Sequence, residues 1–408
     1  MSNQTKYKLG ELLEVTRGAS LSGEFYSTTG KYVRLTCGNF DYQNNCFKKN
    51  TSKDNLYYTG EFKPEFLLKK GDIITPLTEQ AIGLLGSTAL IPENGKYIQS
   101  QDIAKITCDE ELLDRHFAFY LIPSNLVRRQ LSSGAQQTKI RHTSPDKIKD
   151  CTVWIPNLET QARIGKLLSD IDKKIALNRE INRNLEAMAR QLYDYWFVQF
   201  DFPDENGRPY KSSGGKMVWN ERLKREIPIG WETTEIGDIL AKIPGSIRLS
   251  TDEYLQYGKF PIIDQTTNVY FAGFTDREDA VVDTFPVVVF GDHSCAVKYV
   301  NFEFARGADG TQIMKSKNNR ISTECLYFAV LDIRLGKGYA RHYSMIKGYP
   351  IIVPSQTTAE QFKDIASMLF EKIIKNRFEI LKLIKQRDEL LPLLMNGQVS
   401  VNCDLSLD

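Results

Sequence analysis

The sequence repeats itself with a period of about 200 residues, and this duplication constrains the fold more than any other feature. Residues 9–13 (LGELL) resemble residues 236–240 (IGDIL), and residues 141–144 (RHTS) resemble residues 341–344 (RHYS). A period this long does not fit a solenoid, whose units have about 20–45 residues. The chain is therefore predicted to contain two copies of a two-part unit, a globular domain followed by a helix.

Each copy ends in a long helical pattern whose seam residues recur at alternating steps of four and three. Such heptads, sustained over several turns, predict a coiled coil. The alternative is that two amphipathic helices pack separately on globular cores. The seam residues are Ile164, Leu168, Ile171, Ile175, Asn178, Asn182, Leu185, Ala189, Leu192 and Trp196 in the first copy, and Phe362, Ala366, Leu369, Ile373, Asn376, Ile380, Leu383, Arg387, Leu390 and Leu394 in the second.

Polar residues suggest the register and the ends of these helices. Asn178 and Asn376 take the same fifth place in their series, close to each midpoint. If the helices pair as an antiparallel coiled coil, we hypothesise that these asparagines hydrogen-bond across the seam and set its register. The alternative is that each is a solvated flanking residue. Thr160 and Thr358 are the predicted N-caps. Pro392 predicts a kink or an end in the second helix.

The repeat divides the chain into segments and gives an α+β fold class. We expect two mixed α/β globular domains joined by two long helices, related by a pseudo-two-fold repeat. Strand-like runs bounded by Gly and Pro, such as residues 72–75 and 287–290, fall in both globular parts. The predicted segments are a first domain at 1–157, a first helix at 158–200, a polar connector at 201–227, a second domain at 228–356, a second helix at 357–397 and a tail at 398–408.

Composition narrows the class of protein. Apolar residues make up 41% and charged residues 25%, which is typical of a globular chain and excludes a disordered one. The net charge of +2 excludes a histone-like polycation. Without a signal-like start or an apolar run of about 18 residues, the chain is expected to be soluble and cytoplasmic, with no membrane partner. The seven cysteines form no CxxC pair, so reduced thiols are expected in place of disulfides or a zinc site.

Motifs for catalysis are absent. The sequence has no phosphate-binding P-loop, no GxGxxG, no HExxH, no GxSxG and no motif of the amino-methyltransferases. Asp54, Glu61 and Lys63 form a nuclease-like pattern, but the second repeat has no counterpart. Asp292 beside His293 could be an acid–base pair, except that neighbouring side chains on a strand point to opposite faces. No catalytic residue and no metal ligand are therefore predicted.

The remaining polar residues favour recognition of a nucleic acid. Each globular domain ends in a loop rich in Gly and in hydrogen-bond donors, and glycine lets the backbone approach a phosphate. Gln and Arg also pair with base edges. For any one residue the alternative is a solvated loop. The candidate DNA-binding residues are Gln136, Gln137, Lys139, Arg141, His142, His293, Lys315, Lys317, Asn318, Arg320, Lys337, Tyr339, Arg341 and His342.

Several stretches together resemble the specificity (S) subunits of type I restriction–modification systems. The resemblance covers essentially the whole chain. The entry to the second helix, at Glu360 and Gln361, is less regular than the first. The stretches are Ile155-Pro156 with residues 161–164 (QARI), residues 195–202 (YWFVQFDF), residues 211–217 (KSSGGKM), residues 227–231 (IPIGW) and residues 393–399 (LLMNGQV).

This resemblance implies a DNA-recognition subunit without catalytic activity of its own. Two target-recognition domains would each read one half of a split site in double-stranded DNA, and helices of about 38 residues would form a ruler about 57 Å long between them. Because the domains differ in sequence, the half-sites should differ. The resemblance also implies two modification subunits that dock on the helices and methylate adenine with S-adenosylmethionine. Restriction subunits would add ATP- and magnesium-dependent translocation and cleavage.

Two other functions stay open from the sequence. A stand-alone nuclease with a coiled-coil spacer would cleave DNA without partners. A structural adaptor would show no salt-dependent DNA binding even with modification subunits present.

Overall fold

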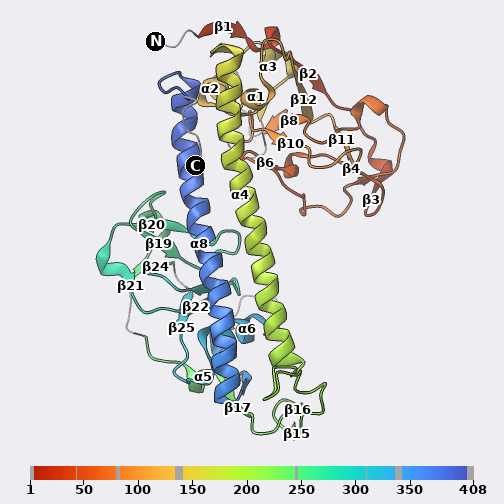
Figure 1. Cartoon of the computed structure of the whole chain (residues 1–408). Helices are drawn as coiled ribbons and strands as arrows, with labels where there is room; N and C mark the ends of the chain where they lie inside the picture. The colour runs from red at the N-terminus through yellow and green to blue at the C-terminus, as the bar shows by residue number, and fades with distance from the viewer. Residues whose placement is uncertain are drawn as a thin grey trace. The chain divides into compact units, whose positions relative to one another are not determined.

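A computed structural model describes residues 4–42, 44–79, 83–133, 141–243, 247–308, 310–335 and 342–401. Two long helices and several small sheets make up the fold, so the predicted α+β class is confirmed (Figure 1). None of the helices in these ranges has a segment long and apolar enough to cross a lipid bilayer.

The chain forms two units, each built from separate parts of the sequence. Unit 1 comprises Met1–Ala176 and Leu381–Asp408, and unit 2 comprises Leu177–Ile380. Each unit therefore joins one globular domain to a segment of both long helices.

The two long helices are α4 (Leu158–Tyr193) and α8 (Gln356–Met395), with 36 and 40 residues. The heptad spacing predicts both, and α4 is followed by a short π-helix, η5 (Asp194–Val198). Pro392 lies inside α8, which ends three residues later at Met395. Since proline has no backbone N–H, the helical hydrogen bond to the backbone oxygen of Asp388 is missing, and α8 ends shortly afterwards.

The N-caps of both helices differ from the prediction. The side-chain oxygen of Asn157 accepts a hydrogen bond from the backbone N–H of Thr160 at 2.9 Å. The hydroxyl of Ser355 accepts one from the N–H of Thr358 at 3.2 Å. Thr160 and Thr358 thus lie within the first turns, and the capping residues stand three positions earlier, where an N-cap side chain reaches the N3 amide.

The globular part of unit 1 is built mainly of short strands. One four-stranded sheet has the order β10-β8-β12-β2, and a second has the order β11-β4-β7-β3. The elements are β1 (Thr5–Lys8), η1 (Leu9–Glu11), β2 (Leu13–Arg17), β3 (Tyr26–Ser27), β4 (Tyr32–Arg34), β5 (Phe40–Asp41), β6 (Cys46–Phe47), β7 (Tyr57–Tyr58), β8 (Ile73–Pro76), β9 (Thr78–Glu79), β10 (Ala89–Leu90), β11 (Tyr97–Ile98), β12 (Ile103–Cys108), α1 (Arg115–Leu121), α2 (Asn125–Ser133), β13 (Arg141–His142), α3 (Pro145–Lys149) and β14 (Thr152–Ile155).

The globular part of unit 2 is also built mainly of short strands. A three-stranded sheet has the order β23-β22-β25, and a second sheet has the path β18-β24-β19-β20. The elements are β15 (Met217–Asn220), β16 (Arg225–Pro228), β17 (Glu232–Glu235), α5 (Ile236–Ile239), β18 (Arg248–Leu249), β19 (Phe260–Ile263), β20 (Gly273–Thr275), β21 (Val281–Val282), β22 (Val287–Gly291), β23 (Val297–Val300), β24 (Phe304–Gly307), β25 (Thr311–Met314), α6 (Thr323–Leu331), α7 (His342–Lys347) and β26 (Pro350–Val353).

The sequence repeat corresponds to a repeated frame. The first strand of each domain pairs antiparallel with the strand that precedes its long helix, β1 with β14 and β17 with β26. A Cβ on Gly10 would lie 3.0 Å from the Cβ of Lys149, and a Cβ on Gly237 would lie 3.2 Å from that of Lys347. Both repeats therefore use a glycine to let the same turn pack closely on the following short helix.

In unit 1 the seam between the helices contains a buried ion pair. Arg387, which is 7% exposed, places Nη1 2.9 Å from the Oδ1 of Asp172. The hydroxyl of Tyr120 donates to the Oδ2 of the same carboxylate at 2.6 Å, and burial, followed by this carboxylate, raises the pKa of the tyrosine. The pair therefore connects α4, α8 and α1.

In unit 2 the helices also run antiparallel, but their asparagines pair differently from the prediction. Asn376 donates to the side-chain oxygen of Asn182 at 2.9 Å, whereas Asn178 donates to Glu379 at 3.1 Å. The predicted bond between Asn178 and Asn376 is therefore wrong. The two series are aligned end to end, as the contact of Trp196 with Phe362 also indicates. In an antiparallel pair of ten-place series, the fifth place of one helix faces the sixth place of the other, not the fifth.

The connector packs against the end of α4 within unit 2. Trp231 lies against Phe197 and Phe202, with ring centroids 5.8 and 4.8 Å apart. Asp201 accepts hydrogen bonds from the backbone N–H and hydroxyl of Ser212 at 2.7 and 2.6 Å. The aromatic and KSSGG stretches of the sequence thus form one folded connection.

Candidate nucleic-acid interface

Several predicted DNA-binding residues lie outside the described residues. These are Gln136, Gln137 and Lys139 in the first domain, and Lys337, Tyr339 and Arg341 in the second. Arg141 is described as a residue of β13, which pairs antiparallel with β9.

His142 is exposed and lies on β13, beside the short strand β9 that comes shortly after β8. Its Nδ1 is 3.3 Å from the hydroxyl oxygen of Thr78, the first residue of β9 and its partner in the β13–β9 pair. Two residues that are distant in the sequence thus meet next to Arg141, the last residue before His142 in the predicted DNA-binding segment.

His293 is exposed on the loop after β22, and its neighbour Asp292 is buried. Asp292 accepts a hydrogen bond from the backbone N–H of Tyr343 at 2.8 Å. The two adjacent side chains therefore face different surroundings, although they lie in the turn after β22 and not on a strand as the sequence argument assumed.

Lys315, Lys317 and Asn318 follow β25. Lys315 donates from Nζ to the backbone oxygen of Phe285 at 3.5 Å, and Lys317 is exposed. Asn318 closes a local turn, since its side-chain oxygen accepts from the N–H of Arg320 at 2.9 Å. Of this group, Lys317 is the residue whose exposure best suits contact with a phosphate.

Arg320 has a structural position. Its guanidinium donates to the backbone oxygen of Pro354 at 2.6 Å and pairs with Glu232 at 3.0 Å. These contacts join the strands β17 and β26 to the loop after β25, immediately before α8. The guanidinium therefore stabilises the frame of the domain.

His342 is 3% exposed, so the prediction that it contacts DNA is contradicted. Burial in the first turn of α7 removes its ring from the surface. The matched sequence Arg-His thus has different environments in the two repeats, exposed on β13 for His142 and buried on α7 for His342.

A second surface lies on the helices of unit 2. Met188 and Ile365 each precede a seam residue, whereas Tyr193 and Phe370 each follow one, so the two pairs flank opposite sides of the seam. Tyr193 and Phe370 are buried in the globular core, but Met188 is 55% exposed. The exposed apolar side chains on the side of Met188 and Ile365 form what we call the exposed stripe. It consists of Met188, Tyr195, Val198, Ile365 and Met368.

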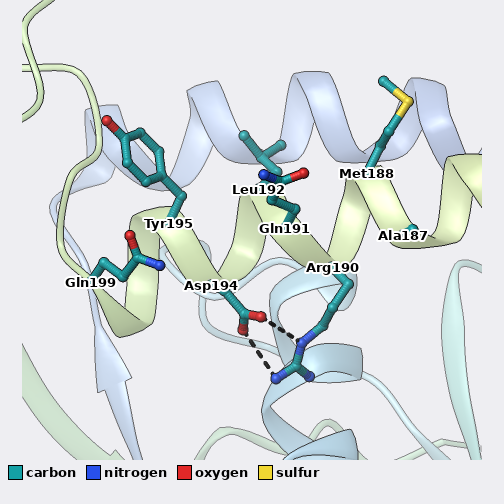
Figure 2. Close-up of a pocket in the computed structure, with 8 residues that line it drawn as sticks. All are labelled: Ala187, Met188, Arg190, Gln191, Leu192, Asp194, Tyr195 and Gln199. Carbon is teal, nitrogen blue, oxygen red and sulfur yellow. Dashed lines mark hydrogen bonds and ion pairs between the residues drawn. The ribbon is translucent and has the colours of Figure 1, made fainter.

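Figure 2 shows the hollow that borders this stripe, with Met188, Leu192 and Tyr195 projecting from the helix. Its volume is about 830 Å³, and it is open to solvent. Arg190 at its edge pairs with Asp194 at 3.0 Å and also with Asp332, which fixes the helix end to the globular domain. An open apolar surface on a helix suits a partner helix better than a small ligand.

Among the described residues, no group of three or more His, Cys, Asp and Glu side chains is close enough to hold a metal ion. The described thiols are all free, and burial raises the pKa of Cys37, Cys108 and Cys151 to about 11. The contact between Thr78 and His142 in unit 1 and the bond between Tyr343 and Asp292 in unit 2 were not predicted. No local motif marks them, since they depend on long-range strand pairing.

Comparison with known proteins places the chain among a defined set of relatives. Residues 1–187 match the family described as the type I restriction modification DNA specificity domain. The chain is 25% identical over 307 residues to the type I restriction enzyme MjaIX specificity subunit of Methanocaldococcus jannaschii, an alignment that covers 70% of this chain and 69% of the relative. It is 24% identical over 413 residues to the HindI specificity subunit of Haemophilus influenzae, covering 81% and 87%.

A solved structure has a similar fold. It is the S subunit of a type I restriction–modification system from M. genitalium, with a TM-score of 0.61, 19% identity and 96% of both chains covered. At this identity the likeness concerns the fold alone.

Proposed function

Because this chain belongs to the family of type I restriction–modification specificity subunits, we propose that it reads a two-part site in double-stranded DNA, one half with each globular domain. The observation that supports this most is the repeated frame, in which the first strand of each domain pairs with the strand that precedes its long helix. The two domains differ in sequence, so the two half-sites are expected to differ. The chain is proposed to act on DNA in the cytoplasm.

The helices are proposed to set the spacing between the half-sites. α4 has 36 residues, which at a rise of 1.5 Å per residue gives a length of about 54 Å. Joining two weak readers through a stiff element makes the second contact intramolecular, so affinity and spacing are both defined.

The exposed stripe is proposed to bind a modification subunit. Met188 and Met368 are 55% and 62% exposed, and apolar side chains arranged along a helix pair suit a third, amphipathic helix. The chain itself is proposed to be non-catalytic and to need no cofactor. Two modification subunits would use S-adenosylmethionine, and restriction subunits would use ATP and magnesium. Since the net charge is only +2, these partners would also supply much of the charge that neutralises phosphates.

The proposal is tested by expressing the chain with its modification subunits in a host that lacks other adenine methylation, followed by methylome sequencing. The expected result is methylation at one two-part motif with a fixed spacer, and none when the chain is omitted. Methylation or cleavage of DNA by the purified chain alone would contradict the proposal.

Assembly is tested by Met188→Glu, which should abolish co-purification of the modification subunit because it places a charge in the exposed stripe. Arg183→Glu, at an exposed position on another face of α4, is the matched control and should leave assembly unchanged. Equal recovery of the complex with both variants would place the docking surface elsewhere.

A further inference from the structure

The two globular domains place different polar residues at one equivalent position. In unit 1, the N–H of Leu77 donates to the backbone oxygen of Asp102 at 2.8 Å, beside the pair Pro76 and Ile103. In unit 2, the N–H of Asp292 donates to the backbone oxygen of Gly310 at 2.8 Å, beside the pair Gly291 and Thr311. Residues in β8 and β12 thus correspond to residues in β22 and β25.

This correspondence fixes which side chains occupy the same place. Thr78 is equivalent to His293, and Asp102 is equivalent to Gly310. We call the groups at these strand ends the first strand-end cluster (Thr78, Asp102 and His142) and the second strand-end cluster (Gln265, His293 and Gly310).

Both clusters contact the residues that directly follow the predicted DNA-binding segments ending at Arg141 and Arg341. The residue two positions after Arg141, Thr143, donates its N–H to the backbone oxygen of Leu77 at 2.9 Å. Tyr343, two positions after Arg341, donates its N–H to Asp292 at 2.8 Å. Each nominated loop therefore returns to its domain at the strand-end cluster.

In the first cluster a carboxylate stands at the surface. The Thr78 hydroxyl lies 3.5 Å from the Oδ1 of Asp102 and 3.3 Å from the Nδ1 of His142. Thr78 is buried, Asp102 is half-buried and His142 is exposed. The threonine thus connects two groups that reach the surface, one an acceptor and the other a potential donor.

In the second cluster the equivalent position has no side chain, and Gln265 takes its space. A Cβ on Gly310, which has φ +85°, would lie 3.0 Å from the Oε1 of Gln265 and 2.8 Å from the Cδ2 of His293. The backbone oxygen of Gln265 accepts from the Ser294 hydroxyl at 2.6 Å, which fixes its loop against the end of β22. The glutamine amide therefore stands where the first domain has the Asp102 carboxylate.

Positive charge is close to the second cluster. Arg248 lies opposite Arg306 in the parallel pair β18–β24. Burial is the main cause that lowers the pKa of Arg306, and the charge of Arg248 is the second. Arg306 also interacts electrostatically with Tyr343, the residue whose N–H binds Asp292. Arg306 donates from Nε to the backbone oxygen of Thr311, next to Gly310, at 2.8 Å. Arg248 is exposed, so of the two it suits an approaching phosphate backbone.

We propose that Asp102 and Gln265 are specificity-determining residues, each reading a base edge in its own half-site. This inference rests on the proposed function. A carboxylate only accepts hydrogen bonds and suits the cytosine amino group, whereas the amide of glutamine both donates and accepts and suits adenine. The same place in the two domains thus discriminates different bases, which gives two unlike half-sites from one repeated frame.

The test uses the complete complex with its modification subunits and compares methylomes. Gln265→Ala and Gln265→Glu should each change the base preference at one position of one half-site, by about 5- to 150-fold, while the other half-site and the spacer stay the same. Asp102→Asn should change one position in the opposite half-site. Asn268→Ala and Gln101→Ala, exposed residues of the same loops, are the controls and should leave the motif unchanged.

Four outcomes separate the inference from the proposed function. An unchanged motif with Gln265→Ala overturns the inference alone. A change at the same half-site with both Gln265→Ala and Asp102→Asn also overturns it. Absence of a two-part motif with the wild-type chain overturns the proposed function. If the complex with Gln265→Ala methylates no DNA at all, the Gln265→Glu complex decides the matter. The inference requires that this second variant unfold at the wild-type temperature and methylate a shifted motif.

Discussion

Asn376 donates a hydrogen bond from its side-chain amide to the side-chain oxygen of Asn182, with 2.9 Å between the two atoms. Asn182 in turn donates to the backbone oxygen of Ile373 at 3.1 Å and is 6% exposed. A buried amide with both functions satisfied favours one register of the helices, because a shift would leave these groups without partners.

The first prediction concerns this amide pair. Asn182→Ala should lower the free energy of unfolding by about 1–3 kcal/mol, because the partners of its amide lose their bonds. Asn184→Ala, on the exposed face of the same helix, should change it by less than about 0.5 kcal/mol. Urea denaturation measures both, and equal losses would show that the seam asparagine has no special role.

The second prediction concerns the ion pair of unit 1. Arg387→Met should lower the free energy of unfolding by about 1–3 kcal/mol, since Asp172 then lacks its cation but remains partly exposed to water. Asp172→Asn combined with Arg387→Met should cost less than the two single changes added together. Lys382→Met, an exposed change on α8, is the control; a strictly additive cycle would refute the coupling.

The third prediction separates a structural arginine from a DNA-contacting lysine. Arg320→Ala should lower the melting temperature of the chain, because the backbone oxygen of Pro354 loses a charged donor. Lys317→Ala should leave the melting temperature unchanged and reduce the salt dependence of DNA binding by the complex by about one phosphate contact. Binding isotherms at several salt concentrations measure this, and the opposite assignment of the two effects would contradict it.

The fourth prediction concerns alkaline pH. Burial raises the pKa of Cys325 from about 9 to about 12, so the unfolded thiol ionises first as the pH rises. The contribution of this shift to the free energy of unfolding is complete below pH 9 and is lost as the pH rises towards 12. Between pH 9 and 10.5 the free energy of unfolding should fall by about 2 kcal/mol for this reason. Cys325→Ala should therefore lose less stability than the wild type over this range in urea titrations. Cys46→Ala, at a partly exposed position, should follow the wild type; a Cys325→Ala curve that falls equally steeply would sink the prediction.

The fifth prediction concerns helix length. Seven residues inserted after both Ala176 and Ile380 keep the heptad phase and lengthen each helix by about 10 Å. The methylome should show a spacer longer by about three base pairs, with both half-sites retained. Insertion into α4 alone breaks the pairing of the seams and should abolish methylation. Altered half-sites with the original spacer would argue against a ruler.

The helices were the part of the fold most accessible from the sequence. Their spacing is local, so residues such as Leu168 and Phe362 identify the buried face without knowledge of the rest. The pairing of Asn182 with Asn376 was accessible too, because in an antiparallel pair of ten-place series the sixth place faces the fifth; matching equal places gave the wrong partner. The caps Asn157 and Ser355 differ from the predicted threonines by only one turn.

The candidate interface was accessible only in part. The polar loops stand out in composition, but the sequence does not show burial or bonding. His342 is buried, and Arg320 is half-buried and bonded to the backbone oxygen of Pro354. Thr78, Asp102 and Gln265 belong to short strand ends that meet through long-range pairing. Their role could be inferred only once the two repeats were compared in three dimensions.

The composition of unit 1 has a consequence for how the chain is made. Gln4 donates to the backbone oxygen of Met395 at 3.2 Å, and Leu394 lies in the same core as Leu168. At about 5–20 residues per second, a ribosome needs roughly 10–40 seconds to pass from Ala176 to Leu381. The first domain therefore leaves the ribosome long before the helix that completes its core, and a message cut short in its second half yields no finished unit 1.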